Sequence, residues 1–381
     1  MKITIPKTQL LKAALPAAGF SSNRETIAAI EGILFRTVGE DQCELCAYDL
    51  EKGMKTTVSC TVEEEGSGVI NCSRFLQIVR AMPDGDLTVD IDERSLRVTI
   101  TGGKAVFELQ AIGSKDFPDL PELRGDRGFS IGQGVLRSIL QKTQFAIAVD
   151  NVRPELNGLN LKGKGQTLTA VSCDGSRLAL YEETLEIKNL GSSELAFDII
   201  LPGKTIGELM RFLSDSEDEV KVFVARKHAV FFIGSFTLFT RLIDAQYIDY
   251  ERFLPKAPKI FVTAATAAVN GALERALLVT EDRQQGQVKS PVICKFEGGV
   301  FTVSSSSITG RVCDAIPAEQ EGEDLEIGFN CRLLSDAVKV CDEEKIKLSL
   351  TSPLSAMTIE PVGGEKERKF VLLVLPVRLN K

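Results

Sequence analysis

The glycine-rich run at residues 158–165, Gly-Leu-Asn-Leu-Lys-Gly-Lys-Gly, has residues that could bind a phosphate. It contains both glycines and the lysine of a phosphate-binding loop, but Gly165 stands where a serine or threonine would hold magnesium. The residues on either side read as two strands, so no helix N-terminus is available to a phosphate. We therefore predict a hairpin turn here and not a nucleotide site.

Cys43 and Cys46 have the spacing of a zinc or redox pair. They lie in a predicted strand, where residues three apart point to opposite faces, and no second pair or nearby histidine completes a tetrahedral site. We expect two buried strand cysteines and no metal site. The single histidine, His228, falls in a predicted hairpin turn, where we expect it to be exposed, so acid–base catalysis by histidine has little support.

Residues 172–177, Ser-Cys-Asp-Gly-Ser-Arg, contain nucleophilic side chains. No base accompanies them in the sequence, and Asp-Gly after an apolar strand is first of all a turn signal. The acidic run Asp215, Glu217, Asp218 and Glu219 is expected to be a solvated loop and not a two-acid site. We predict that the protein is not an enzyme and needs no cofactor. An enzyme that uses the Cys173 and Asp174 region remains as an alternative.

The elements around these residues repeat three times along the chain. Arg74, Lys204 and Arg332 each open a predicted helix, and they lie about 130 positions apart, which is the length of a domain. After each helix comes a strongly alternating strand, with apolar residues at 87, 89 and 91, at 220, 222 and 224, and at 346, 348 and 350. The sequence therefore predicts an α+β protein of three tandem similar domains: 1–127, 128–256 and 257–381.

Each predicted domain also begins with a strand and a helix. The strands are expected at Lys2-Ile-Thr-Ile-Pro, Phe129-Ser-Ile and Ile260-Phe-Val, and the helices near 8–20, 134–148 and 266–279. The two halves of a domain then resemble each other as strand, helix, strands. We predict that every domain is a doubled motif, so that the chain holds about six copies of one small unit.

Composition restricts the class of protein. No run of about 18 apolar residues exists and the N-terminus has no apolar signal core, so we expect a soluble cytoplasmic protein without a membrane partner. The nine cysteines are an odd number and are scattered, which fits a reducing compartment better than a disulfide framework.

Charge is divided unevenly between the predicted helices and the rest of the chain. The formal net charge of −8 argues against a protein that simply coats nucleic acid. The predicted helices are nevertheless basic: they carry Lys12, Arg74, Arg80, Arg137, Lys142, Lys204, Arg211, Arg275, Arg332 and Lys339 against Glu208, Glu274 and Asp336. If all helices faced one side, that side alone could attract phosphates. The simpler interpretation is that these charges only keep the helix surfaces soluble.

Five segments carry a resemblance to a known family: 116–121 (Asp-Phe-Pro-Asp-Leu-Pro), 153–158, 170–179, 244–255 and 370–379. In this order, and over the whole chain, they resemble the bacterial sliding clamp, which is the beta subunit of the DNA polymerase III holoenzyme. The resemblance implies the DNA clamp fold. In that fold two subunits form a head-to-tail homodimeric ring, with antiparallel sheets outside and helices lining a central hole.

The resemblance also implies which residues touch DNA. Arg24 matches a DNA-contacting arginine of the family, and Arg153 belongs to a second DNA-touching loop. In that loop Pro154-Glu155 replaces a tyrosine pair and Asp150 replaces a glutamine, so we carry over Arg153 alone. With the basic helix residues, the predicted DNA-binding set is Arg24, Arg74, Arg80, Arg137, Lys142, Arg153, Lys204 and Arg211.

Members of this family bind partner proteins through a short extended peptide that enters an apolar pocket between the second and third domains. The matching residues are Leu156, Cys173, Gly175, Arg177, Leu178, Ile248, Arg252, Phe253, Leu354, Leu373, Leu375, Pro376, Val377 and Arg378. Aliphatic walls, one aromatic ring and several arginines suit an extended peptide. Cys173 and Ile248 depart from the family pattern of threonine and proline, so the peptide preference is expected to shift.

The resemblance implies a DNA-encircling clamp that tethers a polymerase to its template. Its partners would be double-stranded DNA, a second copy of the chain, the DNA polymerase III alpha subunit, the clamp loader and other proteins with a clamp-binding motif. A closed ring would explain how an acidic protein holds DNA, because a topological link needs only weak contacts. The alternative is an acidic repeat scaffold that binds partner peptides without encircling DNA.

Overall fold

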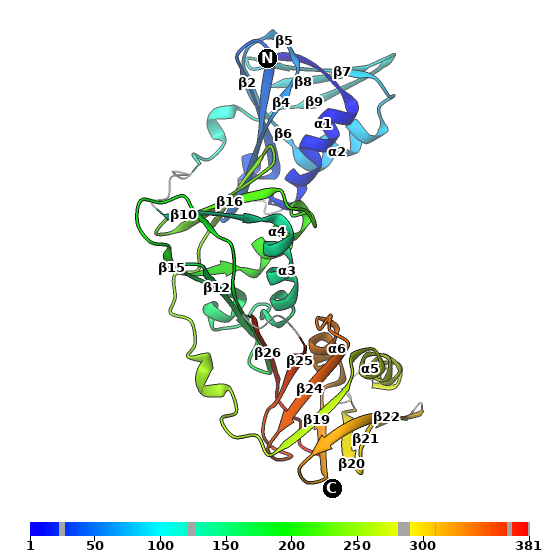
Figure 1. The fold of residues 1–381 in the computed structure, drawn as a ribbon. Coiled ribbons are helices and arrows are strands. Elements are labelled where there is room, and N and C mark those ends of the chain that lie inside the picture. The colour runs from blue at the N-terminus through cyan, green and yellow to red at the C-terminus, as the bar shows by residue number, and fades with distance from the viewer. Residues whose placement is uncertain (23–26, 121–126, 281–289, 309, 364–367, 380–381) are drawn as a thin grey trace. The chain divides into compact units, whose positions relative to one another are not determined.

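The computed structural model describes residues 1–22, 27–120, 127–280, 290–308, 310–363 and 368–379. The chain forms two compact units. Unit 1 consists of Met1–Gln133, Lys188–Ser193 and Arg211–Leu242, and unit 2 of Gly134–Ile187, Glu194–Met210 and Ile243–Lys381. Figure 1 follows the elements from the N-terminus in blue to the C-terminus in red.

The first repeat of elements has two halves, each with a strand, a helix and further strands. The first half is β1 (Lys2–Pro6), α1 (Lys7–Ala14), β2 (Gly32–Val38), β3 (Gln42–Tyr48), β4 (Lys52–Ser59) and β5 (Thr61–Glu64). The second half is β6 (Ser67–Asn71), α2 (Cys72–Ala81), β7 (Asp86–Asp92), β8 (Arg97–Gly102) and β9 (Ala105–Gln110).

The same order of elements occurs twice more, except that the third repeat has no separate counterpart of β5. The second repeat is β10 (Arg127–Gly132), α3 (Gln133–Thr143), β11 (Gly158–Lys164), β12 (Thr167–Cys173), β13 (Arg177–Thr184), β14 (Lys188–Asn189), β15 (Ala196–Pro202), α4 (Gly203–Phe212), β16 (Glu219–Val224), β17 (His228–Ile233) and β18 (Phe236–Arg241). The third repeat is β19 (Ile260–Ala265), α5 (Thr266–Thr280), β20 (Val292–Glu297), β21 (Val300–Ser306), β22 (Arg311–Glu321), β23 (Leu325–Phe329), α6 (Cys331–Lys339), β24 (Lys345–Leu350), β25 (Met357–Val362) and β26 (Arg368–Val374). The predicted doubled motif is confirmed, whereas the boundaries 1–127, 128–256 and 257–381 stay a prediction.

The strands form three antiparallel sheets. Unit 1 contains a sheet in the order β5-β1-β7-β8-β9 and another in the order β14-β10-β16-β17-β18-β4-β3-β2-β6. Unit 2 contains the sheet β15-β11-β12-β13-β26-β25-β24-β19-β22-β21-β20-β23. In β7, β16 and β24 the apolar residues predicted to alternate are buried, so these strands are confirmed.

Two sheets join strands that come from different repeats. In unit 1, β4 of the first repeat pairs with β18 of the second, and in unit 2, β13 of the second repeat pairs with β26 of the third. Both pairings are antiparallel. Successive repeats are therefore linked by backbone hydrogen bonds through the fourth strand of one repeat and the last strand of the next.

The helices begin and end slightly differently from the prediction. Two of the three basic residues expected to open helices follow a capping asparagine: the Asn71 side chain accepts a hydrogen bond from the backbone of Arg74, and Asn330 accepts one from Arg332. Because the cap precedes the helix, α2 and α6 begin at a cysteine and α4 begins at Gly203. The helix expected near 8–20 ends at Ala14, where a 3-10 turn with a proline follows.

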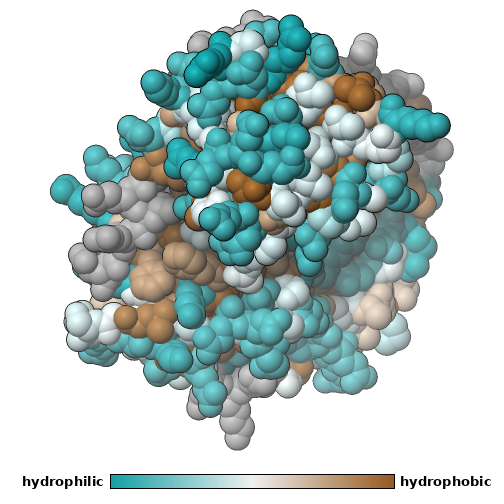
Figure 2. Space-filling view, turned by 90° about the horizontal axis from the view of Figure 1, so that it is seen from above, coloured by the Kyte–Doolittle hydropathy of each residue, from teal (hydrophilic) through white to brown (hydrophobic). Residues whose placement is uncertain are grey.

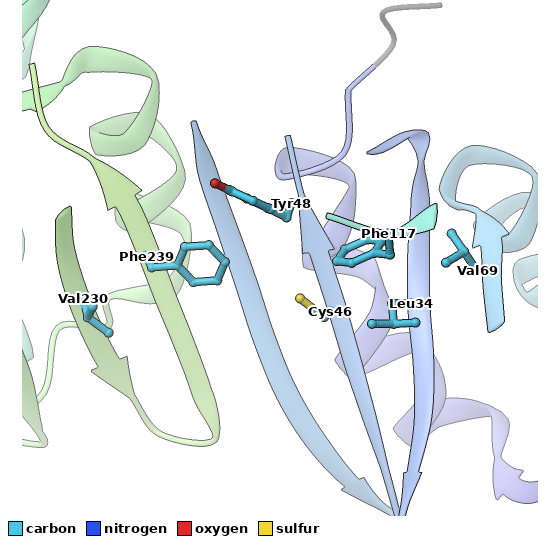
Figure 3. Close-up of a cluster of buried hydrophobic side chains, with 7 residues drawn as sticks. All are labelled: Leu34, Cys46, Tyr48, Val69, Phe117, Val230 and Phe239. Atoms are coloured by element: carbon cyan, nitrogen blue, oxygen red, sulfur yellow. The ribbon is translucent and has the colours of Figure 1, made fainter. Parts of the chain in front are cut away.

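A core cluster in unit 1 lies where β4 meets β18. The residues that pack there are Leu34, Cys46, Tyr48, Val69, Phe117, Val230 and Phe239. Figure 3 shows them on both sides of the junction, and all except Phe117 lie on strands. The ring centroids of Phe239 and Tyr48 are 5.3 Å apart. A Cβ atom on Gly53 would stand 2.2 Å from the Phe239 ring, so glycine allows the ring to lie on the β4 backbone.

The surface is mainly polar, as 26% charged residues would suggest. The face in Figure 2 carries mostly hydrophilic side chains with small hydrophobic areas among them. Within the described part of the chain, no helix is long and apolar enough to cross a membrane.

We expect Phe239→Ala to lower the free energy of unfolding by about 3–5 kcal/mol, because it leaves a cavity at the junction between two repeats. Phe232→Ala is the matched control: Phe232 lies on the adjacent strand β17 with 36% of its surface exposed, and its loss should cost about 1 kcal/mol. Urea unfolding of both variants measures the difference. Equal losses would contradict a core role for the junction.

Candidate functional site

Arg74 and Arg80 lie on the exposed face of α2. The opposite face is buried through Phe75, Leu76 and Val79, so the arginines point away from the core. Lys204 and Arg211 hold equivalent exposed positions on α4, which buries Thr205, Ile206 and Leu209. These four predicted DNA-binding residues present their charge at the surface, where a phosphate could approach.

Two other predicted DNA-binding residues use their charge inside unit 2. Arg137 is half-buried and donates a hydrogen bond to the backbone carbonyl of Met210, with the two atoms 2.8 Å apart. The Lys142 side chain is only 8% exposed, and its Nζ lies 3.1 Å from a carboxylate oxygen of Asp342. Lys142 also lies over the rings of Tyr181 and Phe370. Neither residue offers its cation to solvent as openly as those on α2 and α4.

The loop before the 3-10 turn Pro154–Asn157 holds Arg153 exposed at the surface. Its shape is fixed by the Asn157 side chain, which bonds the backbone of Asn151 through both its oxygen and its nitrogen, at 2.7 and 2.8 Å. Asp150 has a φ of 51°, a conformation that few residues other than glycine adopt. The loop is therefore pre-formed. Arg24, the remaining predicted DNA contact, lies outside the described residues.

A cavity of about 630 Å³ lies in unit 1 beside β9. It is lined by Ala28, Glu31, Ile70, Asn71, Arg74, Ser95, Arg97, Glu108, Leu109, Gln110 and Ile112. Two arginines and two glutamates face it, so it has mixed charge. It contains one predicted DNA-binding residue, Arg74, and none of the predicted peptide-binding residues.

A second cluster, in unit 2, gathers several of the predicted peptide-binding residues. Leu178 on β13 and Leu373 on β26 are direct partners in the sheet and pack with Val171, Leu180 and Val371. Five partly buried residues pack against them: Cys173, Tyr247, Tyr250, Leu254 and Ala356. We call this set of ten residues the β13–β26 cluster.

Exposed apolar residues flank the β13–β26 cluster along the chain. Phe253, Leu354 and Leu375 are 58%, 69% and 42% exposed, and each lies within two residues of a member of the cluster. Arg252 and Arg378 are exposed beside them. Ile248, Pro376 and Val377 are half-buried, Leu156 is buried, and Gly175 forms an exposed turn with a φ of 92°. The sequence predicted Phe253, Leu354 and Leu375 as pocket residues but did not predict Tyr247 and Tyr250.

Arg177, the remaining predicted pocket residue, is held by three partners. Its guanidinium lies 2.9 Å from Asp174 and 2.7 Å from Asp336 on α6, and it covers the ring of Phe145 at 5.1 Å. Its side chain is 12% exposed. Arg177 therefore ties β13 to α6, and part of its charge is already neutralised. Sequence spacing could not reveal this, because Asp336 is 159 positions away.

Cys173 and Tyr247 show no sign of a nucleophilic site. Burial raises the pKa of the Cys173 thiol, which disfavours the thiolate needed for attack. Burial also raises the pKa of Tyr247, whose hydroxyl lacks a hydrogen-bond partner among the described residues. Asp174 is engaged in the turn, where its carboxylate accepts hydrogen bonds from the backbones of Ser176 and Arg177. The predicted turn is confirmed.

The other chemically suggestive residues are structural as well. Residues 158–164 and 167–173 pair as the hairpin β11–β12, as predicted, so no phosphate loop forms. Cys43 and Cys46 are buried on β3, and burial raises the pKa of each to about 12. No group of three or more metal-ligating side chains occurs in the described part of the chain.

His228 corrects a prediction. It is not an exposed turn residue but the half-buried first residue of β17, paired with Arg241. Burial lowers its pKa, and the positive charges of Arg241 and Lys227 lower it further. The hairpin turn is shorter than expected, because the ladder continues to this position.

Profiles of one family match successive parts of the chain. Those described as the N-terminal, central and C-terminal domains of the DNA polymerase III beta subunit match residues 1–121, 130–249 and 251–378. A protein named beta sliding clamp from Halalkalibacterium halodurans is 30% identical over 354 residues, which cover 92% of this chain and 90% of that protein. The chain belongs to the DNA polymerase III beta subunit family.

Similarity to the beta subunit family extends over the whole length. The beta sliding clamp of Bacillus subtilis (strain 168) is 28% identical over 389 residues, covering 99% of this chain and all of that protein. A crystal structure of the DNA polymerase sliding clamp from Bacillus subtilis aligns with a TM-score of 0.91 at 26% identity, covering 100% of both chains. The predicted family and the clamp fold class are confirmed.

For this beta subunit we expect Asp336→Ala to lower the free energy of unfolding by about 1–3 kcal/mol, because it leaves the buried Arg177 guanidinium with only Asp174. Lys339→Ala is the control on the same helix. Its pair with Glu274 is exposed, with side chains 43% and 59% accessible, and should be worth less than about 0.5 kcal/mol. Urea midpoints compare the two variants, and equal losses would show that Asp336 does not hold Arg177.

Proposed function

We propose that this chain is a DNA sliding clamp, which encircles duplex DNA as a homodimeric ring and tethers the replicative polymerase for processive synthesis. The family membership and the clamp fold support this function. The clamp has no catalytic step of its own and needs no cofactor. The alternative, an acidic scaffold that binds partner peptides without encircling DNA, is not favoured.

The observation that supports ring closure is that one strand of the first repeat and one of the third have no partner strand from another repeat. The fourth strands of the repeats are β4, β13 and β22, and the last strands are β9, β18 and β26. Inside the chain β4 pairs with β18 and β13 with β26. This leaves β9, which pairs with β8, and Arg311–Pro317 of β22, which pair with β21. A second copy of the chain supplies the missing neighbour of each strand.

An acidic clamp holds DNA by enclosing it. Once the ring is closed, the protein leaves the duplex only at an end or when the ring opens, so individual phosphate contacts stay weak and mobile. The exposed Arg74, Arg80, Lys204 and Arg211 then make the inner surface favourable to phosphates. Arg24 and Arg153 add contacts, whereas Arg137 and Lys142 contribute mainly to the stability of the fold.

Partner proteins dock at the β13–β26 cluster. An extended peptide covers the exposed side chains of Phe253, Leu354 and Leu375, and its acidic or carbonyl groups meet Arg252 and Arg378. The partners are the DNA polymerase III alpha subunit, the clamp loader and other proteins with a clamp-binding motif. We place the protein in the cytoplasm and assign its three clamp domains to 1–127, 128–256 and 257–381.

The test of this function compares circular with linear DNA. The protein is loaded on a nicked circular plasmid by the clamp loader with ATP, and its co-elution with DNA is measured by gel filtration. If the link is topological, we expect the protein to stay on the circular plasmid. We also expect it to leave within minutes after a restriction enzyme linearises the plasmid. Equal retention on both forms would contradict encirclement and favour a protein that binds along DNA.

The same assay tests the helix arginines. Arg74→Glu with Arg80→Glu should shorten the lifetime on the circle and make it more sensitive to salt, because repulsion replaces attraction at α2. Arg94→Glu with Arg226→Glu changes the net charge equally at exposed turns of unit 1 and serves as the control. Equal lifetimes for the two double variants would remove α2 from the DNA-facing surface.

The peptide site gives a separate prediction. Phe253→Ala with Leu354→Ala should weaken binding of an alpha-subunit clamp-binding peptide at least about ten-fold, and deletion of residues 375–381 should abolish it. Leu278→Ala, at a residue on α5 that is 79% exposed, is the control for loss of surface apolar area in unit 2. Fluorescence anisotropy of a labelled peptide measures all three proteins. Unchanged affinity in the truncated chain would place the pocket elsewhere.

A further inference from the structure

The turn at residues 174–177, beside the β13–β26 cluster, has a counterpart at residues 49–52. Each turn begins with an aspartate, Asp49 or Asp174, whose Oδ1 accepts hydrogen bonds from the backbone amides of the third and fourth residues. The second residue of each turn has a positive φ, 76° at Leu50 and 92° at Gly175. Both turns lead into a strand that pairs with another repeat, so they are equivalent positions in the fold.

The fourth residue of each turn is basic and lies over an aromatic ring. The Nζ of Lys52 is 4.9 Å from the centroid of the Phe20 ring, and the Arg177 guanidinium is 5.1 Å from that of Phe145. Each basic side chain also pairs with the aspartate that begins its own turn. The two turns are therefore built from the same parts.

The two turns differ in what else holds the basic side chain. Lys52 donates a hydrogen bond to the backbone carbonyl of Gly19, which also belongs to the first repeat. Arg177 donates instead to the carboxylate of Asp336, 2.7 Å away on α6, and α6 belongs to the third repeat. A carboxylate from another repeat is thus added at the turn that lies beside the proposed peptide site.

Arg177 and the β13–β26 cluster lie on opposite faces of the sheet. Successive side chains of a strand alternate between the two faces, so Arg177 points away from Leu178, which belongs to the cluster. The Arg177 side chain is 12% exposed and lies against Phe145 and Asp336. A peptide that covers the cluster therefore does not need to contact the guanidinium, whose effect on binding would be indirect.

The turn that Arg177 holds supports one of the proposed peptide-binding residues. The carbonyl of Ser176 accepts a hydrogen bond from the amide of Leu375, with the two atoms 2.9 Å apart. Two residues later, the amide of Val377 donates to the carbonyl of Gly328 at 2.8 Å. These two bonds place the segment that follows β26, and the first of them depends on the turn. A continuous set of contacts therefore leads from Asp336 to Leu375.

We infer that Asp336 is a positioning residue for the partner peptide, an inference that rests on the peptide-binding function proposed above. Through Arg177, Asp336 keeps residues 174–177 in the shape that supports Leu375. The exposed apolar side chain of Leu375 is then in place before a peptide arrives. Binding requires less ordering of the site, which favours affinity.

Fluorescence anisotropy of the labelled alpha-subunit peptide tests this role. Asp336→Ala should weaken binding about ten-fold, because the turn loses its support from α6. Asp336→Glu keeps the carboxylate and should restore the affinity to within about three-fold of the wild-type value. Lys339→Ala, at an exposed position on the same helix, is the control and should bind as tightly as the wild-type protein.

A double-mutant cycle shows whether Asp336 acts through Arg177. Arg177→Ala should weaken binding by about as much as Asp336→Ala, and the double variant should lose no more than about two-fold beyond either single variant. Losses that multiply in the double variant would overturn the inference, because Asp336 would then influence the peptide by another route.

A general loss of stability predicts a different pattern. Phe239→Ala, which we expect to destabilise unit 1, should leave the peptide affinity unchanged at a temperature where the variant stays folded. An equal loss of affinity in Phe239→Ala and Asp336→Ala would assign both effects to destabilisation and overturn the inference.

The outcomes also separate the inference from the proposed peptide site. If the wild-type protein binds the peptide and Asp336→Ala binds equally tightly, the positioning role is wrong and the peptide site stands. If the wild-type protein does not bind the peptide, the peptide site and the positioning role are both wrong.

Discussion

The pairing of strands between successive repeats organises this molecule. Each repeat of elements offers its fourth strand and its last strand to another repeat, and the chain satisfies two of these pairings internally, β4 with β18 and β13 with β26. Three repeats in a row therefore leave one fourth strand and one last strand without a partner from another repeat. A second subunit can satisfy both in a closed assembly, whereas open chains of subunits would grow without limit. Two of the six junction strands, β9 and β22, are thus left for a second subunit, and pairing both of them closes a ring.

Enclosure of DNA removes the usual requirement for a strongly basic protein. The net charge of −8 would repel a duplex in solution, but a ring around the duplex needs only a favourable inner surface. We propose the amphipathic helices α2 and α4 as that surface, since their apolar faces are buried and their basic residues are exposed. The proposed peptide site has a different chemistry, because exposed apolar side chains flank the sheet junction at the β13–β26 cluster. The two proposed activities therefore use separate residues.

The local elements were predictable because they follow short periods in the sequence. Alternation at 87–91, 220–224 and 346–350 identified β7, β16 and β24, and their spacing exposed the repeat. Helix ends were less accurate, because the capping residues Asn71 and Asn330 lie three and two residues before Arg74 and Arg332. The site was harder, since side-chain partners come from distant positions. From its place on a helix, Lys142 was predicted to offer its charge to DNA, yet Asp342 and two aromatic rings cover it. Arg177 is likewise held by Asp336. Family resemblance supplied the pocket residues that periodicity could not.

Negative-stain electron microscopy of the purified protein, at a concentration where the dimer persists, tests ring closure most directly. The account predicts class averages of a closed ring with a six-fold outline, from six repeated domains, and a central hole wide enough for a duplex. Compact particles or open arcs, with a monomeric mass in solution, would contradict it and return the acidic scaffold to first place.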